Sequence, residues 1–420
     1  EKSLSAHFKE LFQTLSSDKI LTLTILVSAL GYFVDVFDLL LFSIVRIQSL
    51  RDLGVAEAEL LSTGIDLLNV QMAGLFLGGI TFGIIGDKVG RVSVLFASII
   101  LYSLGSIANG FITTVTQYEF LRFITGFGLA GELGICITLS SELLPRHLRG
   151  LGTTFIAGVG VLGAGAAAIV SDMVDWRTAY IIGGLLGLCL LAMRLRLRES
   201  HLFRKMESEE EKITRGNIFM FFKNGSLAKR YVIVTLMGLP IWAMLATMIT
   251  FTVEFAKDFG MTELPNTGMA ILSQNIGTAL GIVGVGMLSQ HLHSRKKAIT
   301  VFMLLGVLSV VVFTGVRADS LSCYYLMCGF LGFGIGYWAM AVQTGTEQFG
   351  TNLRATATTS LPNVIRAFAI PATLLFQALI PELGVTMSGA VVVLGAWLIG
   401  FIALALTQET FHADLDFLEK

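Results

Sequence analysis

Four ionisable residues stand inside long apolar stretches of the sequence, where a charged side chain is out of place. Asp35 and Asp38 are three residues apart in the first stretch, and Arg122 and Glu132 are ten residues apart in a later one. An ionised side chain inside a bilayer costs about 3 kcal/mol or more, so these residues are expected to serve a function. A carboxylate that gains and loses an arginine partner also loses and gains affinity for a proton.

This chemistry suits a protein that couples a proton to a change of conformation. Asp35 and Asp38 share one face of a helix because of their spacing. We expect both to act in proton coupling with Arg122, and the alternative is a static buried ion pair. Glu132 lies about 80° round the helix from Arg122 and roughly 15 Å along it. We expect Glu132 to be a second protonation site, with a substrate contact or a structural acid held by polar neighbours as the alternatives.

The composition indicates which elements carry these residues. The 420 residues are 54% hydrophobic and 14% charged, whereas soluble domains are about 45–50% apolar and about 25% charged. These values exclude a soluble globular protein and a disordered chain. The net charge of −1 gives no reason to expect a nucleic-acid partner. The four cysteines lack metal-binding spacing, and we expect no metal site, no cofactor and no enzymatic activity.

Apolar runs that are long enough to cross a bilayer, about 20 residues each, recur twelve times. A polar stretch separates the first six from the last six. The sequence predicts an all-α integral membrane protein with twelve transmembrane helices in two bundles. The expected parts are an amphipathic segment at 1–19, an N-terminal six-helix bundle at 20–195, a linker at 196–230, a C-terminal six-helix bundle at 231–407 and a tail at 408–420.

The basic residues set the expected orientation. Most of the 29 Lys and Arg residues fall on the side of the N-terminus, which the positive-inside rule assigns to the cytoplasm. Both termini, the linker and the surface segment at 1–19 are then cytoplasmic. We expect a multi-pass protein of the inner (cytoplasmic) membrane, monomeric in the lipid bilayer.

Two loops recur in the second half of the chain. The loop around Asp87 has a counterpart around Gln290, 203 residues later, and the segment around Arg149 has one around Arg354, 205 residues later. Two anchors with nearly the same offset indicate an internal repeat. The two bundles are therefore expected to be pseudo-symmetric.

The loop Gly83-Ile-Ile-Gly-Asp-Lys-Val-Gly-Arg91 resembles the signature of the major facilitator superfamily (MFS). Three further stretches are similar to the metabolite:proton symporters of that superfamily. They are Asp35-Val-Phe-Asp38, the Arg…Gly…Gly-Glu pattern that runs from Arg122 to Glu132, and residues 195–203. The chain departs from that family at Asp35, Ala130 and His201, where the family usually has Glu, Gly and Pro.

The resemblance implies an MFS fold in which helices 1 and 4 line a central cavity, so that Arg122 can meet Asp35 and Asp38. It also implies a cytoplasmic gate built on the loop after helix 2 and on the segments that follow helices 4 and 10. We expect the gate residues to be Asp87, Arg91, Glu142, Arg149, Glu347 and Arg354.

The C-terminal bundle offers a different set of residues. The positions that correspond to Asp35, Asp38 and Arg122 are Pro240, Ala243 and Met327, so proton handling is expected in the N-terminal bundle. Aromatic and polar residues of the C-terminal bundle are expected to bind the substrate, although each alone is equally compatible with packing. They are Trp242, Gln274, Asn275, Tyr337, Trp338, Gln343, Asn363 and Arg366.

Together these features predict a proton-coupled symporter that imports a small polar metabolite by alternating access. The substrate is expected to be an organic acid, an amino-acid-like compound or a zwitterion, and Arg366 is the best candidate to bind its carboxylate. The alternatives are an uncoupled facilitator or antiporter of the same fold, and a membrane sensor that binds a metabolite without moving it.

Overall fold

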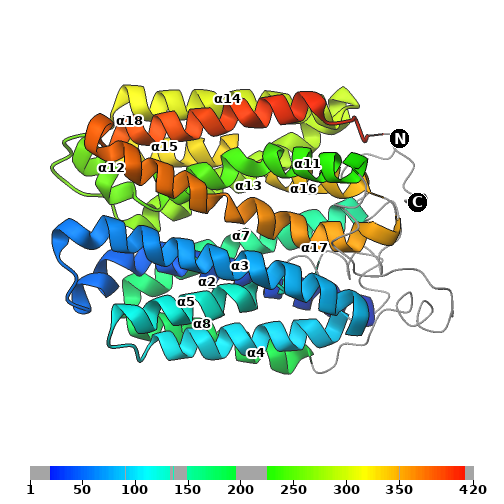
Figure 1. The fold of residues 1–420 in the computed structure, drawn as a ribbon, viewed down its shortest axis with the longest axis horizontal. Helices are drawn as coiled ribbons and strands as arrows, with labels where there is room; N and C mark the ends of the chain where they lie inside the picture. Colours follow the sequence, from blue (N-terminus) through cyan, green and yellow to red (C-terminus); the bar gives the residue numbers. More distant parts are fainter. Residues whose placement is uncertain are drawn as a thin grey trace.

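The computed structural model describes residues 19–89, 91–132, 136, 149–194, 225–349 and 351–411 (Figure 1). Nearly all of the segment expected at 1–19, and most of the linker at 196–230 and of the tail at 408–420, lie outside these residues. Every regular element in the described part is helical.

The N-terminal half contributes six long helices, preceded or joined by short connections such as the 3₁₀ turn Glu57–Glu59. The six are α2 (Lys19–Asp52), α3 (Leu60–Val89), α4 (Arg91–Asn109), α5 (Val115–Leu129), α7 (Arg149–Met173) and α8 (Trp176–Arg194).

The C-terminal half contains more helices, and several of them are short. They are α11 (Gly225–Met244), the π-helix η3 (Leu245–Ile249), α12 (Thr252–Asp258), α13 (Thr267–Leu292), α14 (Arg295–Val316), α15 (Leu321–Gly334), α16 (Trp338–Glu347), α17 (Thr351–Ala367) and α18 (Ala369–Leu406).

These helices account for twelve crossings of a membrane. Nine stretches of the described residues are long and apolar enough to span it. The last of them, Ser360–Leu406, holds two crossings because the chain turns at Gly384, whose φ of 74° suits glycine. The other two crossings are α7, with the apolar stretch Gly158–Met173, and the 15-residue α5. The predicted all-α, twelve-span architecture is confirmed.

In the C-terminal half, three of the predicted spans are interrupted in the structure. In the first, α11 contains Pro240 and passes into η3 and then α12, since proline removes a backbone hydrogen bond of the helix. The second breaks at residues 335–337, between α15 and α16, and the third at Phe368, between α17 and α18. Hydropathy alone does not reveal these breaks because the flanking residues are equally apolar.

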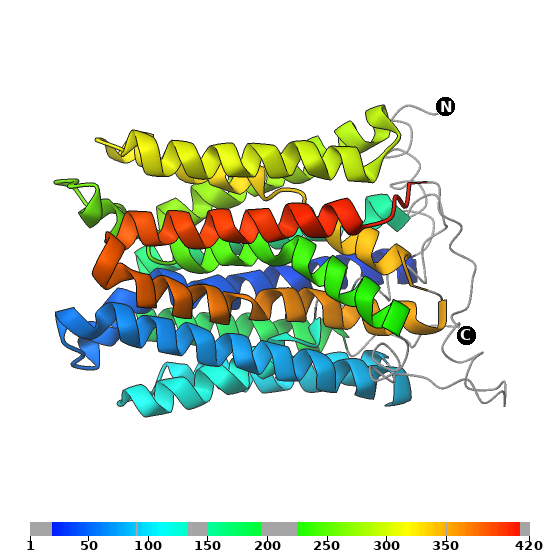
Figure 2. The same ribbon diagram turned by 45° about the horizontal axis from the view of Figure 1, so that its top comes forward.

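The helices run side by side along the long axis of the molecule (Figure 1). The N-terminal helices gather in one half and the C-terminal helices in the other, with α3 packed against α17 and α18, and α7 against α13. In both views the start of α2 and the end of α18 lie at the same end of the molecule (Figures 1 and 2). We call the opposite end the outer end, because the sequence predicts that it faces away from the cytoplasm.

Glycines allow α3 and α5 to touch backbone to backbone. A Cβ atom at Gly74 would collide with the backbone of Phe123 and Phe127, and one at Gly126 would collide with the carbonyl of Gln71. Only glycine fits at such an approach, and small residues are typical of helix contacts in membranes.

The same contacts recur between α13 and α15. Gly277 faces the backbone of Gly329 and Phe333, and Gly332 faces the carbonyl of Gln274. Each residue lies 203 or 206 places after its counterpart in the α3–α5 pair. The pseudo-symmetry that the loops predict is therefore also present in the packing of the two bundles.

We expect Gly277→Ala to destabilise the protein. The added methyl group would displace the backbone of α15, and overpacking of this kind costs about 1–3 kcal/mol. Gly286→Ala in the same helix is the matched control, because nothing lies within 4 Å of the added Cβ and alanine favours a helix. Thermal unfolding in detergent should show a lower midpoint for Gly277→Ala alone; equal midpoints for both variants would contradict this packing.

Candidate functional site

Asp35 pairs with an arginine of the opposite bundle. Its Oδ2 lies 3.1 Å from Nη2 of Arg366, and both side chains are buried. The guanidinium of Arg366 also stands 5.6 Å from the ring centroid of Trp242. The sequence predicts Arg366 as a substrate ligand and Asp35 as a coupling residue, and the structure places the two side by side where α2 meets α17.

Asp38 is the acid that meets Arg122. The closest oxygen and nitrogen of the two side chains are 4.0 Å apart, and both groups are fully buried. Asp38 Oδ1 accepts a hydrogen bond of 2.6 Å from Ser106. No N–H group of Arg122 makes a hydrogen bond within the described residues. Its guanidinium lies 5.2 Å from the ring centroid of Phe42 and 5.7 Å from that of Tyr180.

Glu132 has a different partner, at the end of α8. Its carboxylate accepts hydrogen bonds from both terminal nitrogens of Arg194, with Nη1–Oε2 at 3.0 Å. The pair lies against Gly31 of α2, where a Cβ atom would collide with both side chains. As its position round the helix suggests, Glu132 does not join the ion pair of Arg122.

A cavity of about 80 Å³ lies between the bundles. Five of the eight predicted substrate residues line it, namely Trp242, Gln274, Asn275, Trp338 and Arg366. The lining also includes residues that sequence reasoning did not select, among them Tyr32, Val36, Leu39, Val161 and Thr278. An apolar, aromatic cavity with one cationic group at its wall suits a small ligand that carries an anionic group.

Hydrogen bonds along α13 orient the amide side chains of the cavity. Gln274 Nε2 donates to Thr278 Oγ1 at 2.7 Å, and Asn275 Nδ2 donates to Gln274 Oε1 at 3.0 Å. These amides are therefore held in a fixed orientation at the cavity wall.

The other three predicted substrate residues are not among those that line the cavity. Tyr337 is buried and donates to a backbone carbonyl of α11 at 3.2 Å. Gln343 donates to Glu347 at 3.2 Å. Asn363 Nδ2 donates to the carbonyl of Ala130 at 2.9 Å and so joins the two bundles.

The structure describes one of the six predicted gate side chains, that of Glu347, which forms an ion pair with Arg295 at the start of α14. Glu409 accepts hydrogen bonds there from Ser294 and from the backbone of Arg295 and Lys296. Partial burial raises the pKa of Glu409, but these hydrogen bonds hold it below its usual value. Glu142 and the side chains of Asp87, Arg91, Arg149 and Arg354 lie outside the described part.

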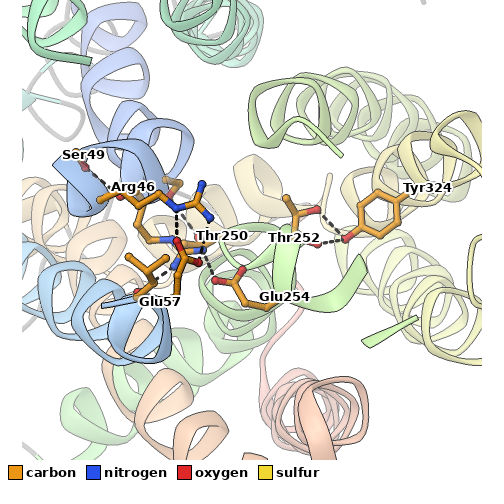
Figure 3. A network of polar contacts seen from close by, with 10 residues as sticks. Arg46, Ser49, Glu57, Thr250, Thr252, Glu254 and Tyr324 are labelled. Atoms are coloured by element: carbon orange, nitrogen blue, oxygen red, sulfur yellow. Dashed lines mark hydrogen bonds and ion pairs between the residues drawn. The ribbon is translucent and has the colours of Figure 1, made fainter. Parts of the chain in front are cut away.

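At the outer end, a second ion pair of the described residues joins the bundles (Figure 3). Arg46 of α2 donates to Glu254 of α12 at 2.6 Å, and its guanidinium stands 4.6 Å from the ring centroid of Phe251. Ser43 of α2 and Thr250, which directly follows η3, form a further contact of 3.3 Å. We call the contact of Arg46 with Glu254 the outer latch.

Sequence reasoning missed the outer latch because the first apolar run ends near Arg46, which then counts as a loop residue. The structure continues α2 to Asp52, so Arg46 lies inside the helix with a relative exposure of 1%. A wider hollow of about 420 Å³ opens at the same end of α2, between Gln48, Asp172 and Asn266.

Replacement of Arg46 by Gln is expected to open the outer end. Removing one partner of a buried ion pair costs about 3–5 kcal/mol. Here the free-energy loss destabilises the conformation in which the two bundles touch at the outer end. Spin labels at Glu59 and Asp319, both exposed at the outer end, should show a longer distance in Arg46→Gln. Arg51→Gln is the control, because the pair of Arg51 with Glu57 is exposed and lies within one bundle. The same distance distribution in all three proteins would exclude the latch.

Comparisons with known proteins agree with this architecture. Residues 21–373 match the family model of the Major Facilitator Superfamily. A "Putative metabolite transport protein" of Haemophilus influenzae is 29% identical over 81% of this chain and 84% of its own length. The "Putative niacin/nicotinamide transporter NiaP" of Bacillus subtilis is 26% identical over 79% and 81%.

The fold also resembles a solved transporter structure. The xylose transporter XylE from E. coli, in a partially occluded inward open conformation, superposes with a TM-score of 0.70 at 15% identity, covering 95% of this chain and all of that one. The family match covers most of the chain and the fold agrees with it. This chain is a membrane transporter of the major facilitator superfamily.

Proposed function

We propose that this chain is a proton-coupled symporter that imports a small polar metabolite by alternating access. The loose pairing of Asp38 with Arg122 carries the proposal. A buried pair that serves stability gains from short, bidentate contacts. Here the two charges stand 4.0 Å apart, and the N–H groups of Arg122 make no hydrogen bonds in the described part of the chain.

Such a pair is suited to a switch. When Asp38 binds a proton, its attraction to Arg122 disappears, and α2 is released from α5. A conformation that separates the two groups then favours the protonated acid, and a conformation that joins them favours proton release. Glu132 makes two contacts with Arg194, so we assign the proton to the acids of α2 and a structural role to Glu132.

The bundle interface supports alternating access. Polar contacts of single side chains join the bundles at the outer latch and at Asn363. Contacts of this kind break and form again as one bundle rocks against the other. We propose that the outer latch closes the outer end of the transporter. The six predicted gate residues, which include Asp87 and Arg354, close its cytoplasmic end.

The cavity supports a small substrate with an anionic group. Arg366 is the cation at its wall, and Trp242 and Trp338 provide flat apolar surface. One relative is named for niacin and nicotinamide, and niacin is a carboxylate on an aromatic ring. We propose a small organic acid as the substrate and the inner membrane as the location, with the chain acting as a monomer.

Asp38→Asn should abolish uphill uptake. A ligand is first found as a compound that raises the melting temperature, from a panel of organic acids, amino acids, zwitterions, nicotinate and nicotinamide. In liposomes with an inward proton gradient, the wild type should concentrate this ligand, whereas Asp38→Asn should only exchange internal for external ligand. The exposed residue Asp319 provides the matched control, Asp319→Asn.

Uphill uptake by Asp38→Asn at the wild-type rate would contradict the role of Asp38. Wild-type uptake that a protonophore leaves unchanged would indicate an uncoupled facilitator. Saturable binding without any flux would indicate a sensor.

A further inference from the structure

Arg366 is shielded from water, and its charged partner in the described residues belongs to the opposite bundle. Only Nη2 takes part in the ion pair with Asp35. Nε and Nη1 of Arg366, and Oδ1 of Asp35, make no hydrogen bond within the described part of the chain. A guanidinium can donate two parallel hydrogen bonds to one carboxylate. In this pair, Arg366 uses only one of these donors.

A guanidinium at this depth is strongly destabilised when no anion stands beside it. Leaving it unpaired costs about 3–5 kcal/mol. Asp35 belongs to α2 and Arg366 to α17, so a rocking motion of the bundles pulls the two groups apart. Another anion must then take the place of Asp35.

The cavity of about 80 Å³ beside Arg366 can admit a carboxylate group, and it must widen to hold an aromatic ring as well, since a cavity that binds benzene measures about 150 Å³. Arg366 lines it together with Trp242, Trp338 and Ile241. The guanidinium stands 5.6 Å from the Trp242 ring centroid, so a flat ligand on the same wall would bring its carboxylate to Arg366. The polar groups of α13 are held by hydrogen bonds along their own helix, which leaves Arg366 as the main charged contact.

The buried charges around α2 are balanced while the site is empty. Three acids face three arginines in the pairs Asp35–Arg366, Asp38–Arg122 and Glu132–Arg194, and the outer latch is a fourth balanced pair. Tyr32 lies one turn before Asp35 and lines the cavity. A ligand carboxylate alone would add an uncompensated negative charge, whereas a ligand carboxylate together with one proton on Asp35 restores the balance.

We propose that Asp35 is an internal stand-in for the substrate: its carboxylate occupies Arg366 in the empty site, and the carboxylate of a flat monoacid replaces it. The replacement requires one proton, taken from water onto Asp35, which then releases Arg366. This inference rests on the proposed symport, in which the two acids of α2 share the transported proton: Asp35 holds it while the substrate occupies Arg366, and Asp38 holds it when α2 separates from α5. It also predicts that a neutral carboxamide of the same shape gains nothing from Arg366.

The test measures binding to the purified protein at about pH 8, without transport. Nicotinate and benzoate are the carboxylate probes, and nicotinamide and benzamide are their neutral matches. Asp35→Asn should bind the carboxylates about tenfold more tightly than the wild type, because the competing anion is gone. The amides should bind equally to both proteins, and Asp319→Asn should behave as the wild type.

A double-mutant cycle attributes the effect to Arg366. Arg366→Gln should weaken carboxylate binding about tenfold or more, and Asp35→Asn should give no gain in that background. Arg366→Lys, which keeps the charge, should retain the preference for carboxylates. Thermal unfolding of each variant identifies one that fails to fold.

Several results would overturn the inference. They are equal or weaker carboxylate binding by Asp35→Asn, a gain shared by the amides, a gain that persists in Arg366→Gln, and failure of every carboxylate to bind. The proposed function fails separately, through uptake that does not respond to a proton gradient.

Discussion

A charge that is removed from water must keep an opposite charge beside it, and this constraint organises the interior of the protein. Within the described residues, four acids and four arginines lie buried or nearly buried on or beside α2 in matched pairs. Each pair sits in surroundings where loss of one partner costs several kcal/mol. The Asp35–Arg366 pair bridges the bundles, so in the proposed mechanism the bundles part there when a proton neutralises the acid and another anion reaches the arginine.

The helix α2 carries one partner of three of these ion pairs. It carries Asp35 toward α17, Asp38 toward α5 and Arg46 toward α12. It also supplies Gly31, which leaves room for the pair of Glu132 and Arg194. A shift of this one helix therefore acts on the central cavity and on the outer latch together, and this is the connection that alternating access requires.

Much of this arrangement could be predicted from the sequence. Twelve apolar runs and the repeated loops give the two bundles, since hydropathy and repeats report on helices that each cross a membrane. The position of Asp35, Asp38 and Arg122 within apolar runs placed them inside the membrane, and Asp38 does meet Arg122. The aromatic and polar residues of the C-terminal bundle indicated five of the side chains that line the cavity.

The partners across long distances could not be predicted. Asp35 and Arg366 are 331 residues apart, and their meeting depends on how the two bundles face each other. Tyr337 and Trp338 are neighbours in the sequence, yet only Trp338 lines the cavity. Hydropathy did not reveal the break at residues 335–337 that precedes α16. Arg46 counted as a loop residue, because a charge at the end of an apolar run gives no sign of how far the helix continues.

The exchange of one carboxylate for another on Arg366 has a direct physical signature, which is the uptake of a proton. The measurement is the number of protons taken from a weakly buffered solution at about pH 8 when the tightest-binding carboxylate is added to the purified protein. Proton uptake of close to one per bound ligand in the wild type, and none in Asp35→Asn, is the predicted result. Binding without proton uptake in the wild type, or equal uptake in Asp35→Asn, would contradict the mechanism.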